Sequence, residues 1–70
     1  MGREQLANHL KVRRAERNLT QADLAALSNT TRKSINAIEM GRMVPSTFLA
    51  LKLAHALDSS VEQLFYLARR

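Results

Sequence analysis

Apolar residues recur three or four positions apart over most of the chain, and short polar stretches interrupt this pattern. The clearest part is residues 20–41, where one apolar pair lies on each side of a polar turn. Thr20 and Thr31 each stand where a hydroxyl can cap the helix that follows, and Asn29 tolerates the left-handed conformation of a tight turn. This stretch therefore predicts two short helices, the second ending at Gly41. The apolar pairs are Leu24 with Leu27 and Ile35 with Ile38.

Three further helices are predicted around this pair. The first runs from about Arg3 to Arg17. A later one, residues 47–57, is apolar around much of its circumference, which is typical of a helix in the centre of a bundle. Ser60 and Gln63 have the spacing of a capping box and open a fifth helix. We find no strand pattern, so the sequence predicts one compact all-α domain of five helices that spans residues 1–70.

The charge of the chain indicates which class of molecule it binds. Eleven Lys and Arg against six Asp and Glu give a net charge of +5 and an isoelectric point near 10.8. A small basic domain commonly binds a polyanion, usually nucleic acid. Because the chain has no cysteine, its stability must come from helix packing rather than from disulfides or a cysteine zinc site. Four basic residues gather late in the first predicted helix: Lys11, Arg13, Arg14 and Arg17.

Several classes of function lack support in the sequence. No apolar run approaches the roughly 20 residues that span a bilayer, and the N-terminus lacks the apolar core of a signal peptide, so we expect a cytoplasmic protein. His9 and His55 lie on different predicted helices, without neighbouring carboxylates to complete a metal or catalytic site. No phosphate-binding loop or nucleophile motif is present. We therefore expect no enzyme activity and no cofactor, metal or small-molecule site.

One ordered set of residues extends from about Leu10 to Phe65, over roughly four fifths of the chain. The set comprises Leu19-Thr20-Gln21, Leu24-Ala25, Ser28-Asn29-Thr30, Thr31-Arg32, Ile35-Asn36-Ala37-Ile38-Glu39, Gly41-Arg42, Val44-Pro45-Ser46, Ala50-Leu51-Lys52, Ala54-His55-Ala56-Leu57 and Ser60-Val61-Glu62-Gln63-Leu64-Phe65. In this order the residues resemble the Cro/repressor type of helix-turn-helix domain, also called the xenobiotic-response-element family, of bacterial and phage regulators. The resemblance implies a lambda-repressor-like fold with residues 20–41 as its helix-turn-helix.

The resemblance also implies that the helix over residues 31–40 lies in the major groove of DNA. Arg32 or Lys33 can then donate hydrogen bonds to guanine O6 and N7, while Asn36 either pairs with adenine or contacts only the backbone. The methyl group of Ala37 or of Thr31 can pack on the methyl group of thymine. The implied base-contacting residues are Thr31, Arg32, Lys33, Asn36 and Ala37.

Other positions carry over as phosphate-binding or structural residues. Gln21 falls at the start of the preceding helix, where the family binds phosphate. Further phosphate candidates are Ser34, Arg42, Arg13 and the backbone around Met43. Arg14 and Glu39 match a pair that forms a partly buried salt bridge in related repressors, and this pair would tie the first helix to the recognition helix.

Such domains usually bind a palindromic operator as two-fold dimers, with half-sites about 34 Å apart. The candidate dimer surface comprises the predicted fifth helix and the stretch Phe65-Tyr66-Leu67. Packing of Phe65 in the core is the alternative, and it would leave Tyr66 and Leu67 as the exposed apolar residues.

The preferred hypothesis is therefore a small transcriptional regulator that binds specific duplex DNA sequences, most simply as a homodimeric repressor. A phage-type repressor, a restriction-modification controller and a toxin–antitoxin partner all fit this description. The alternative is a protein-interaction helical module, such as an antitoxin-type partner binder, which acidic residues at the positions of Arg32 and Lys33 would have favoured. RNA binding lacks the aromatic residues that stack on single-stranded bases.

Overall fold

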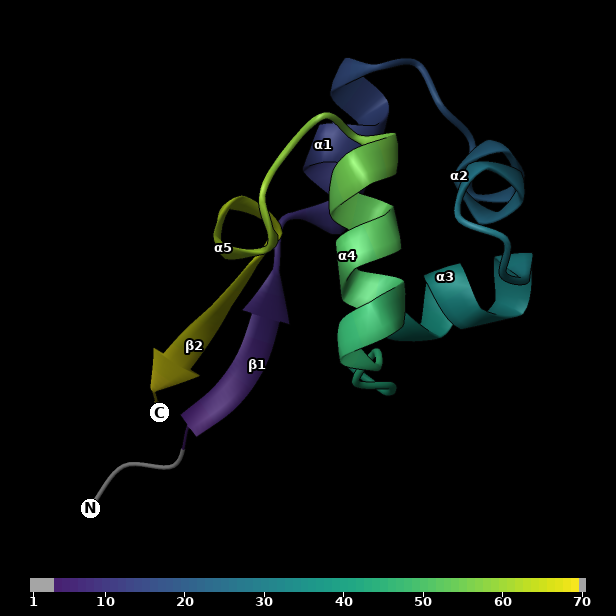
Figure 1. Ribbon diagram of the computed structural model, residues 1–70. Helices are drawn as coiled ribbons and strands as arrows, with labels where there is room; N and C mark the ends of the chain where they lie inside the picture. Colours follow the sequence, from purple (N-terminus) through teal and green to yellow (C-terminus); the bar gives the residue numbers. More distant parts are fainter. Residues whose placement is uncertain (1–3, 70) are drawn as a thin grey trace.

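The computed structural model describes residues 4–69 and arranges them as five helices and a two-stranded sheet (Figure 1). The elements in chain order are β1 (Glu4–Asn8), α1 (Leu10–Glu16), α2 (Gln21–Leu27), α3 (Arg32–Glu39), α4 (Thr47–Ala56), α5 (Val61–Leu64) and β2 (Phe65–Arg69). In Figure 1, α2 and α3 lie on one side of α4 and the sheet lies on the other. Because the sheet projects beyond the helices, the molecule is 39 Å long but only 21 Å across.

The sheet shows that the all-α prediction was wrong at both ends of the chain. β1 and β2 pair antiparallel, with Leu6 opposite Leu67. Residues 4–8 are therefore a strand instead of the first turns of a helix, and Arg3, the predicted start of that helix, lies outside the described residues. The fifth helix is a single turn, and the residues after it form the second strand. Each strand supplies the backbone partners that the other lacks.

Asn8 is the last residue of β1, and its side chain forms hydrogen bonds that hold the start of α1 in place. Its side-chain oxygen accepts a hydrogen bond from the backbone N–H of Leu10 at 3.1 Å, and its side-chain nitrogen donates to the carbonyl of Ile38 at 3.0 Å. At the other root of the sheet, Phe65 has extended backbone angles (φ −126°, ψ 143°) and packs in the core. Phe65 is thus a core residue, which was the alternative to a dimer contact.

The core lies between α4 and the elements around it. Leu53 and Leu57 are fully buried, whereas Phe48 and Leu51 expose 70% and 55% of their surface. The prediction of a central helix is therefore correct for one face of α4 only. On the open face the Lys52 ammonium lies 4.5 Å from the centre of the Phe48 ring. The other large apolar side chains that are fully buried are Leu10, Leu24, Ile35, Ile38 and Leu64.

Hydroxyl side chains cap four of the helices, and three of these caps, Thr20, Thr31 and Ser60, are the ones predicted above. At α2 the Thr20 hydroxyl accepts from the backbone N–H of Asp23 at 3.0 Å, and the Asp23 carboxylate accepts from the backbone N–H of Thr20 at 2.9 Å. The hydrogen bond from that backbone N–H, assisted by the Thr20 hydroxyl, lowers the pKa of Asp23. The ionised carboxylate also suits the positive end of the helix. The other caps are Thr31 on α3, Ser46 on α4 and Ser60, with Gln63, on α5.

Ser28, at the end of α2, is fully buried, and its hydroxyl has no hydrogen-bond partner among the described residues. A buried polar group without a partner costs free energy. We expect Ser28→Ala to raise the free energy of unfolding by about 1 kcal/mol, measured by urea unfolding. Ser59→Ala is the matched control, because the Ser59 hydroxyl donates to the Leu57 carbonyl at 3.1 Å and its loss should destabilise. A clear loss of stability in Ser28→Ala would contradict this prediction.

Candidate nucleic-acid interface

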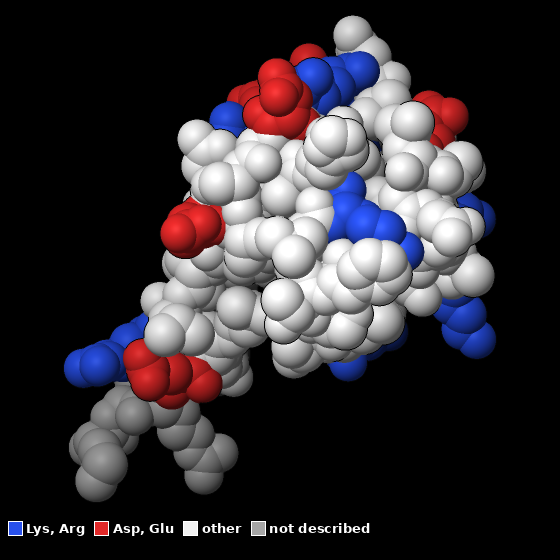
Figure 2. Space-filling model, viewed as in Figure 1, with Lys and Arg blue, Asp and Glu red and all other residues white. Residues whose placement is uncertain are grey.

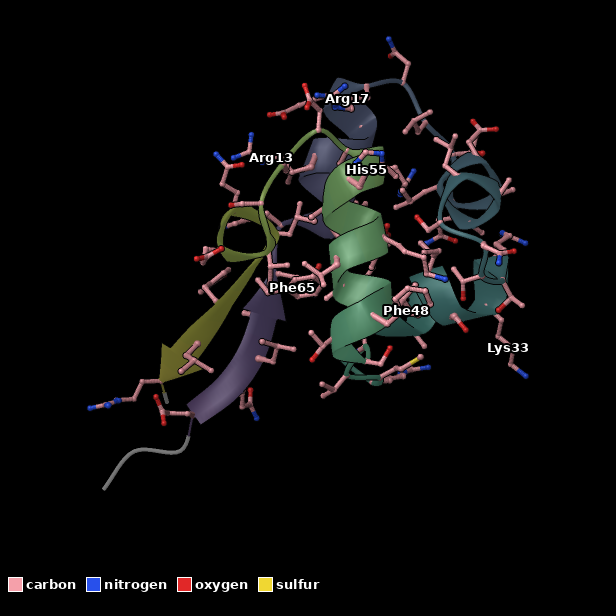
Figure 3. The ribbon with its side chains drawn as sticks, in the orientation of Figure 1. Arg13, Arg17, Lys33, Phe48, His55 and Phe65 are labelled. Carbon is pink, nitrogen blue, oxygen red and sulfur yellow. The ribbon has the colours of Figure 1, made fainter. Side chains whose placement is uncertain are left out.

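α2 and α3 form a helix-turn-helix through the tight turn after Ser28. Asn29 adopts the predicted left-handed conformation (φ 55°), and the N–H of Thr30 donates to the carbonyl of Ala25 at 2.9 Å. Two inward residues of α3, Ile35 and Ile38, are buried in the core. Their burial fixes the opposite face of α3 toward solvent. In Figure 3 Lys33 projects from this face, away from the bundle.

Four of the predicted DNA-contacting side chains come together at the start of α3. They line a shallow hollow of about 340 Å³ between the beginning of α2 and the beginning of α3. The side chains are Gln21, Arg32, Lys33 and Asn36. Arg32, Lys33 and Asn36 are exposed, so their donor groups are accessible to a ligand.

A salt bridge between α1 and α3 lies beneath the exposed surface of these side chains and supports it. Arg14 Nε donates to Glu39 Oε2 at 2.8 Å, and its Nη2 donates to Oε1 at 3.3 Å. Arg14 Nη1 also donates to the carbonyl of Leu19 at 2.7 Å. The two side chains are only 14% and 5% exposed. The hydrogen bond to Glu39 raises the pKa of Arg14, although partial burial acts in the opposite direction. The pair therefore connects α1 to the end of α3 as the resemblance implies.

Gln21 connects this salt bridge to the hollow through two hydrogen bonds. Its side-chain nitrogen donates to Glu39 Oε1 at 3.1 Å and to Asn36 Oδ1 at 3.1 Å. An amide nitrogen has two hydrogens, and both are used by these contacts. Gln21 therefore has no side-chain hydrogen left for a phosphate in this structure.

Further predicted contacts lie at the start of α3 and in the loop that follows it. Thr31 accepts from the Ser34 N–H at 3.1 Å and donates to the Ser34 hydroxyl at 3.0 Å, so both residues support the start of α3. The Arg42 side chain is exposed in the following loop. The backbone N–H groups of Arg42 and Met43 both donate to the carbonyl of Ala37, at 2.8 and 3.2 Å, so they are already engaged.

Arg13 lies apart from this surface. It belongs to α1 and its Nη1 is 3.4 Å from Glu16 Oε1. Figure 3 shows Arg13 and Arg17 in the upper part of the molecule, away from Lys33 at the lower right. The face seen in Figure 2 is mostly uncharged, with the basic side chains mainly at its edges. The structure thus does not bring Arg13 together with the residues of α3.

The sequence profile of the helix-turn-helix family matches residues 10–64, which include the turn, the hollow and the salt bridge described above. The chain belongs to the Cro/repressor-type helix-turn-helix family. Its relatives include two uncharacterized HTH-type transcriptional regulators. MJ0272 of Methanocaldococcus jannaschii is 43% identical over 60 residues, which are 86% of this chain and 91% of the relative. YgzD of Bacillus subtilis is 37% identical over 62 residues, which are 89% and 94% of the two chains.

Solved structures of helix-turn-helix regulators share the fold. The restriction-modification controller protein C.AhdI from Aeromonas hydrophila is 35% identical with a TM-score of 0.74, over 77% of this chain and 82% of that one. The clp gene regulator ClgR from Corynebacterium glutamicum is 33% identical with a TM-score of 0.71, over 74% and 55%. The family profile itself extends from the start of α1 to the end of α5.

Within this helix-turn-helix domain, sequence reasoning missed a second hollow. A groove of about 460 Å³ lies between the root of the sheet and the loop after α3. Ile38 and Phe65 form part of its lining, and so do two exposed apolar residues that follow α3. Met40 is 58% exposed and Val44 is 73% exposed. No local pattern signals this groove, because it forms only when β1 and β2 pair. Its lining residues are Gln5, Leu6, Asn8, Ile38, Met40, Gly41, Met43, Val44 and Phe65.

Two negative findings concern the described residues. Within residues 4–69, no helix is long and apolar enough to cross a membrane. The same part of the chain holds no cluster of three or more His, Cys, Asp or Glu side chains arranged to bind a metal ion.

Proposed function

We propose that this helix-turn-helix protein is a cytoplasmic transcriptional regulator that binds specific sequences of duplex DNA, with α3 in the major groove, and represses by occupying its operator. The hollow at the start of α3 carries this proposal, because it gathers hydrogen-bond donors where a base edge would lie. The net charge of +5 favours a polyanionic ligand. The family, the HTH-type regulators related to this chain and the two regulators of similar fold support the same function.

We assign the contacts by chemistry and position. Arg32 and Lys33 donate to base edges, and Asn36 lies beside them on the same face of α3. Thr31 and Ala37 flank this face and offer methyl groups to thymine. Arg42 contacts phosphate from the loop after α3, and Ser34 remains a phosphate candidate. Arg13 is left out of this interface because of its distant position.

We further propose that the protein acts as a homodimer, with a second copy covering the groove beside the sheet. The groove lies at the C-terminal end of α3, so a copy docked there leaves the N-terminal ends of both recognition helices free for two half-sites. Exposed apolar side chains near it would be buried by this contact. They are Met40, Val44 and Leu67, whereas Tyr66 lies on the other face of the strand and is not part of this contact.

Sedimentation of wild-type protein and of a Val44→Lys/Leu67→Lys variant tests the dimer. Both positions are exposed, so the folded monomer should tolerate the charges. The wild type should sediment as a dimer at micromolar concentration and the variant as a monomer with unchanged helical content. A wild type that remains monomeric at high micromolar concentration, both free and on DNA, would exclude the homodimer.

The function itself is tested by selection from a random pool of duplex DNA. The wild type should enrich one palindromic motif, and an Arg32→Glu/Lys33→Glu variant should enrich none, because two carboxylates would face the phosphates and base acceptors. Glu16→Lys, a surface change on α1, is the control variant and should leave the motif unchanged. No enrichment by the wild type, with no duplex binding at low salt, would exclude the proposed function.

The exposed face of α4 favours one second candidate function, that of a protein-interaction module. Phe48 and Leu51 lie one turn apart on this face, and both are more than half exposed. Under this candidate, replacing both with glutamine would abolish function in the cell, while the charge-reversal variant of α3 would retain it. Our proposal expects the opposite result.

A further inference from the structure

The groove beside the sheet follows one edge of β1. Consecutive residues of a strand point to opposite faces of a sheet, and the groove touches Gln5 as well as Leu6 and Asn8. A hollow over one face alone would not reach both sets of side chains. Among the described residues of β2, only the first, Phe65, lines the groove. The groove therefore runs along the edge of β1 that does not pair with β2, on the side of the loop that enters α4 (Figure 1).

The register of the sheet decides which backbone groups lie at this edge. The N–H of His9 donates to the carbonyl of Leu64 at 2.8 Å, and these two residues continue the register of β1 and β2. In an antiparallel ladder, hydrogen-bonded pairs alternate with pairs whose backbone groups point away from the partner strand. Gln5 and Ala7 therefore bond to β2, whereas the backbone N–H and C=O groups of the alternate residues point to the free edge. These residues are Glu4, Leu6 and Asn8.

A free strand edge beside apolar surface is a site where another strand can add. A second copy of β1 fits this edge, because the strand is self-complementary when it pairs antiparallel about a twofold axis at Leu6. Leu6 then lies opposite Leu6 of the other copy, and Glu4 lies opposite Asn8. The outward backbone groups of all three residues find partners, and no like charges face each other. The exposed side chains of Met40 and Val44, which line the groove, would pack on the added strand.

The free edge of β2 is less suited to such pairing. By the same alternation, its outward residues are Phe65, Leu67 and Arg69. The Phe65 N–H already donates to the carbonyl of Val61, so one donor of that ladder is used. A twofold axis at Leu67 would also place Arg69 opposite Phe65, which is buried at the root of the sheet. The edge of β1 is therefore the better site for a second copy.

We propose that the second copy docks by strand addition: β1 of one copy pairs antiparallel with β1 of the other, and the two sheets of two strands join into one sheet of four. This inference rests on the proposed homodimer and names the element of the partner that fills the groove. Because the groove lies at the C-terminal end of α3, the pairing leaves the N-terminal ends of both recognition helices exposed.

Amide hydrogen exchange of the wild type, measured residue by residue at low micromolar and at near-millimolar concentration, tests this pairing. The Leu6 N–H should exchange more slowly at the higher concentration, by about tenfold or more, because only the dimer gives it an acceptor. Two amides of the same sheet are internal controls. Ala7 bonds to β2, so its N–H should exchange slowly at both concentrations, and Leu67 lies at the free edge of β2, so its N–H should exchange fast at both.

A proline variant tests the same contact by sedimentation. Glu4→Pro removes an outward N–H at the first residue of β1, where a strand tolerates proline. The dimer loses two hydrogen bonds, one on each side of the twofold axis, so its dissociation constant should rise by about tenfold or more. Glu4→Ala keeps the N–H, and Arg69→Pro makes the corresponding change at the free edge of β2. Both controls should dimerise as the wild type does. Circular dichroism and thermal unfolding establish that each variant is folded.

The outcomes are distinct. A dimer whose Leu6 N–H exchanges equally fast at both concentrations, or a Glu4→Pro variant that dimerises as well as Glu4→Ala, would overturn strand addition while the homodimer stands. Slower exchange at Leu67 instead of Leu6 would assign the pairing to β2 and also overturn it. A wild type that stays monomeric at near-millimolar concentration, free and on DNA, would overturn the homodimer itself and leave the groove to a different occupant. Selection from random duplex DNA tests the regulator function separately.

Discussion

Glu39→Ala is expected to lower the free energy of unfolding by about 3 kcal/mol. The substitution leaves the Arg14 guanidinium in a site where its side chain is only 14% exposed and has lost its counter-charge. It also removes the acceptor of one Gln21 hydrogen bond. A small domain has a total stability of only about 5–15 kcal/mol, so the loss should be visible as a large fall in the urea midpoint.

Two further variants isolate the cause. Glu16→Ala removes an exposed ion pair with Arg13 and should change stability by less than about 0.5 kcal/mol. Arg14→Met with Glu39→Leu removes both buried charges and should recover much of the loss, because no unpaired charge remains. If Glu39→Ala costs no more than Glu16→Ala, the salt bridge does not brace the recognition helix.

Arg32→Ala is expected to reduce affinity for the selected duplex by about 1–3 kcal/mol and to relax preference at one base position. The guanidinium is exposed at the start of α3 and lines the hollow with Lys33 and Asn36. Its planar donors suit the two acceptors of guanine. Fluorescence anisotropy with single-base variants of the duplex would measure the change at each position.

Arg42→Ala provides the comparison for that experiment. Arg42 lies in the loop after α3 and is assigned to phosphate, so its loss should weaken all duplexes alike and reduce the dependence of affinity on salt. If both variants produce the same uniform loss, the division between base-contacting and phosphate-contacting residues is wrong.

The helix-turn-helix and its caps were predictable from sequence because their signals are local. Thr20 with Asp23 and Ser60 with Gln63 are spaced for capping boxes, and both boxes form. Asn29 was expected to be left-handed, and it is. In each case the residue pattern and the contact that it specifies lie within a few positions of each other.

The two strands could not be predicted in this way. Leu6 and Leu67 face each other across the sheet although they lie near opposite ends of the chain. Each end alone has apolar residues at spacings compatible with a helix, and only the pairing of the two satisfies their backbone groups as strands. For the same reason the sequence indicated neither the groove beside the sheet nor the strand that contains Tyr66 and Leu67.

The positions of the candidate site could be predicted from the sequence, but the hydrogen bonds between its side chains could not. The spacing along α3 places Arg32, Lys33 and Asn36 on one surface. The resemblance places Gln21 near phosphate, yet its amide is engaged by Glu39 and Asn36. Sequence spacing does not contain this information, since the hydrogen bonds depend on how α2 packs across α3.

Sequence-specific binding of duplex DNA by α3 is the central claim, and the ratio of two affinities tests it most directly. The dissociation constant of the wild type would be measured at about 150 mM salt for the selected duplex and for a scrambled duplex of equal length and composition. We predict a preference of about a thousandfold or more for the selected duplex, and a loss of most of this preference in Arg32→Ala/Asn36→Ala. Equal affinity for the two duplexes, or a preference that the double variant retains in full, would contradict the claim.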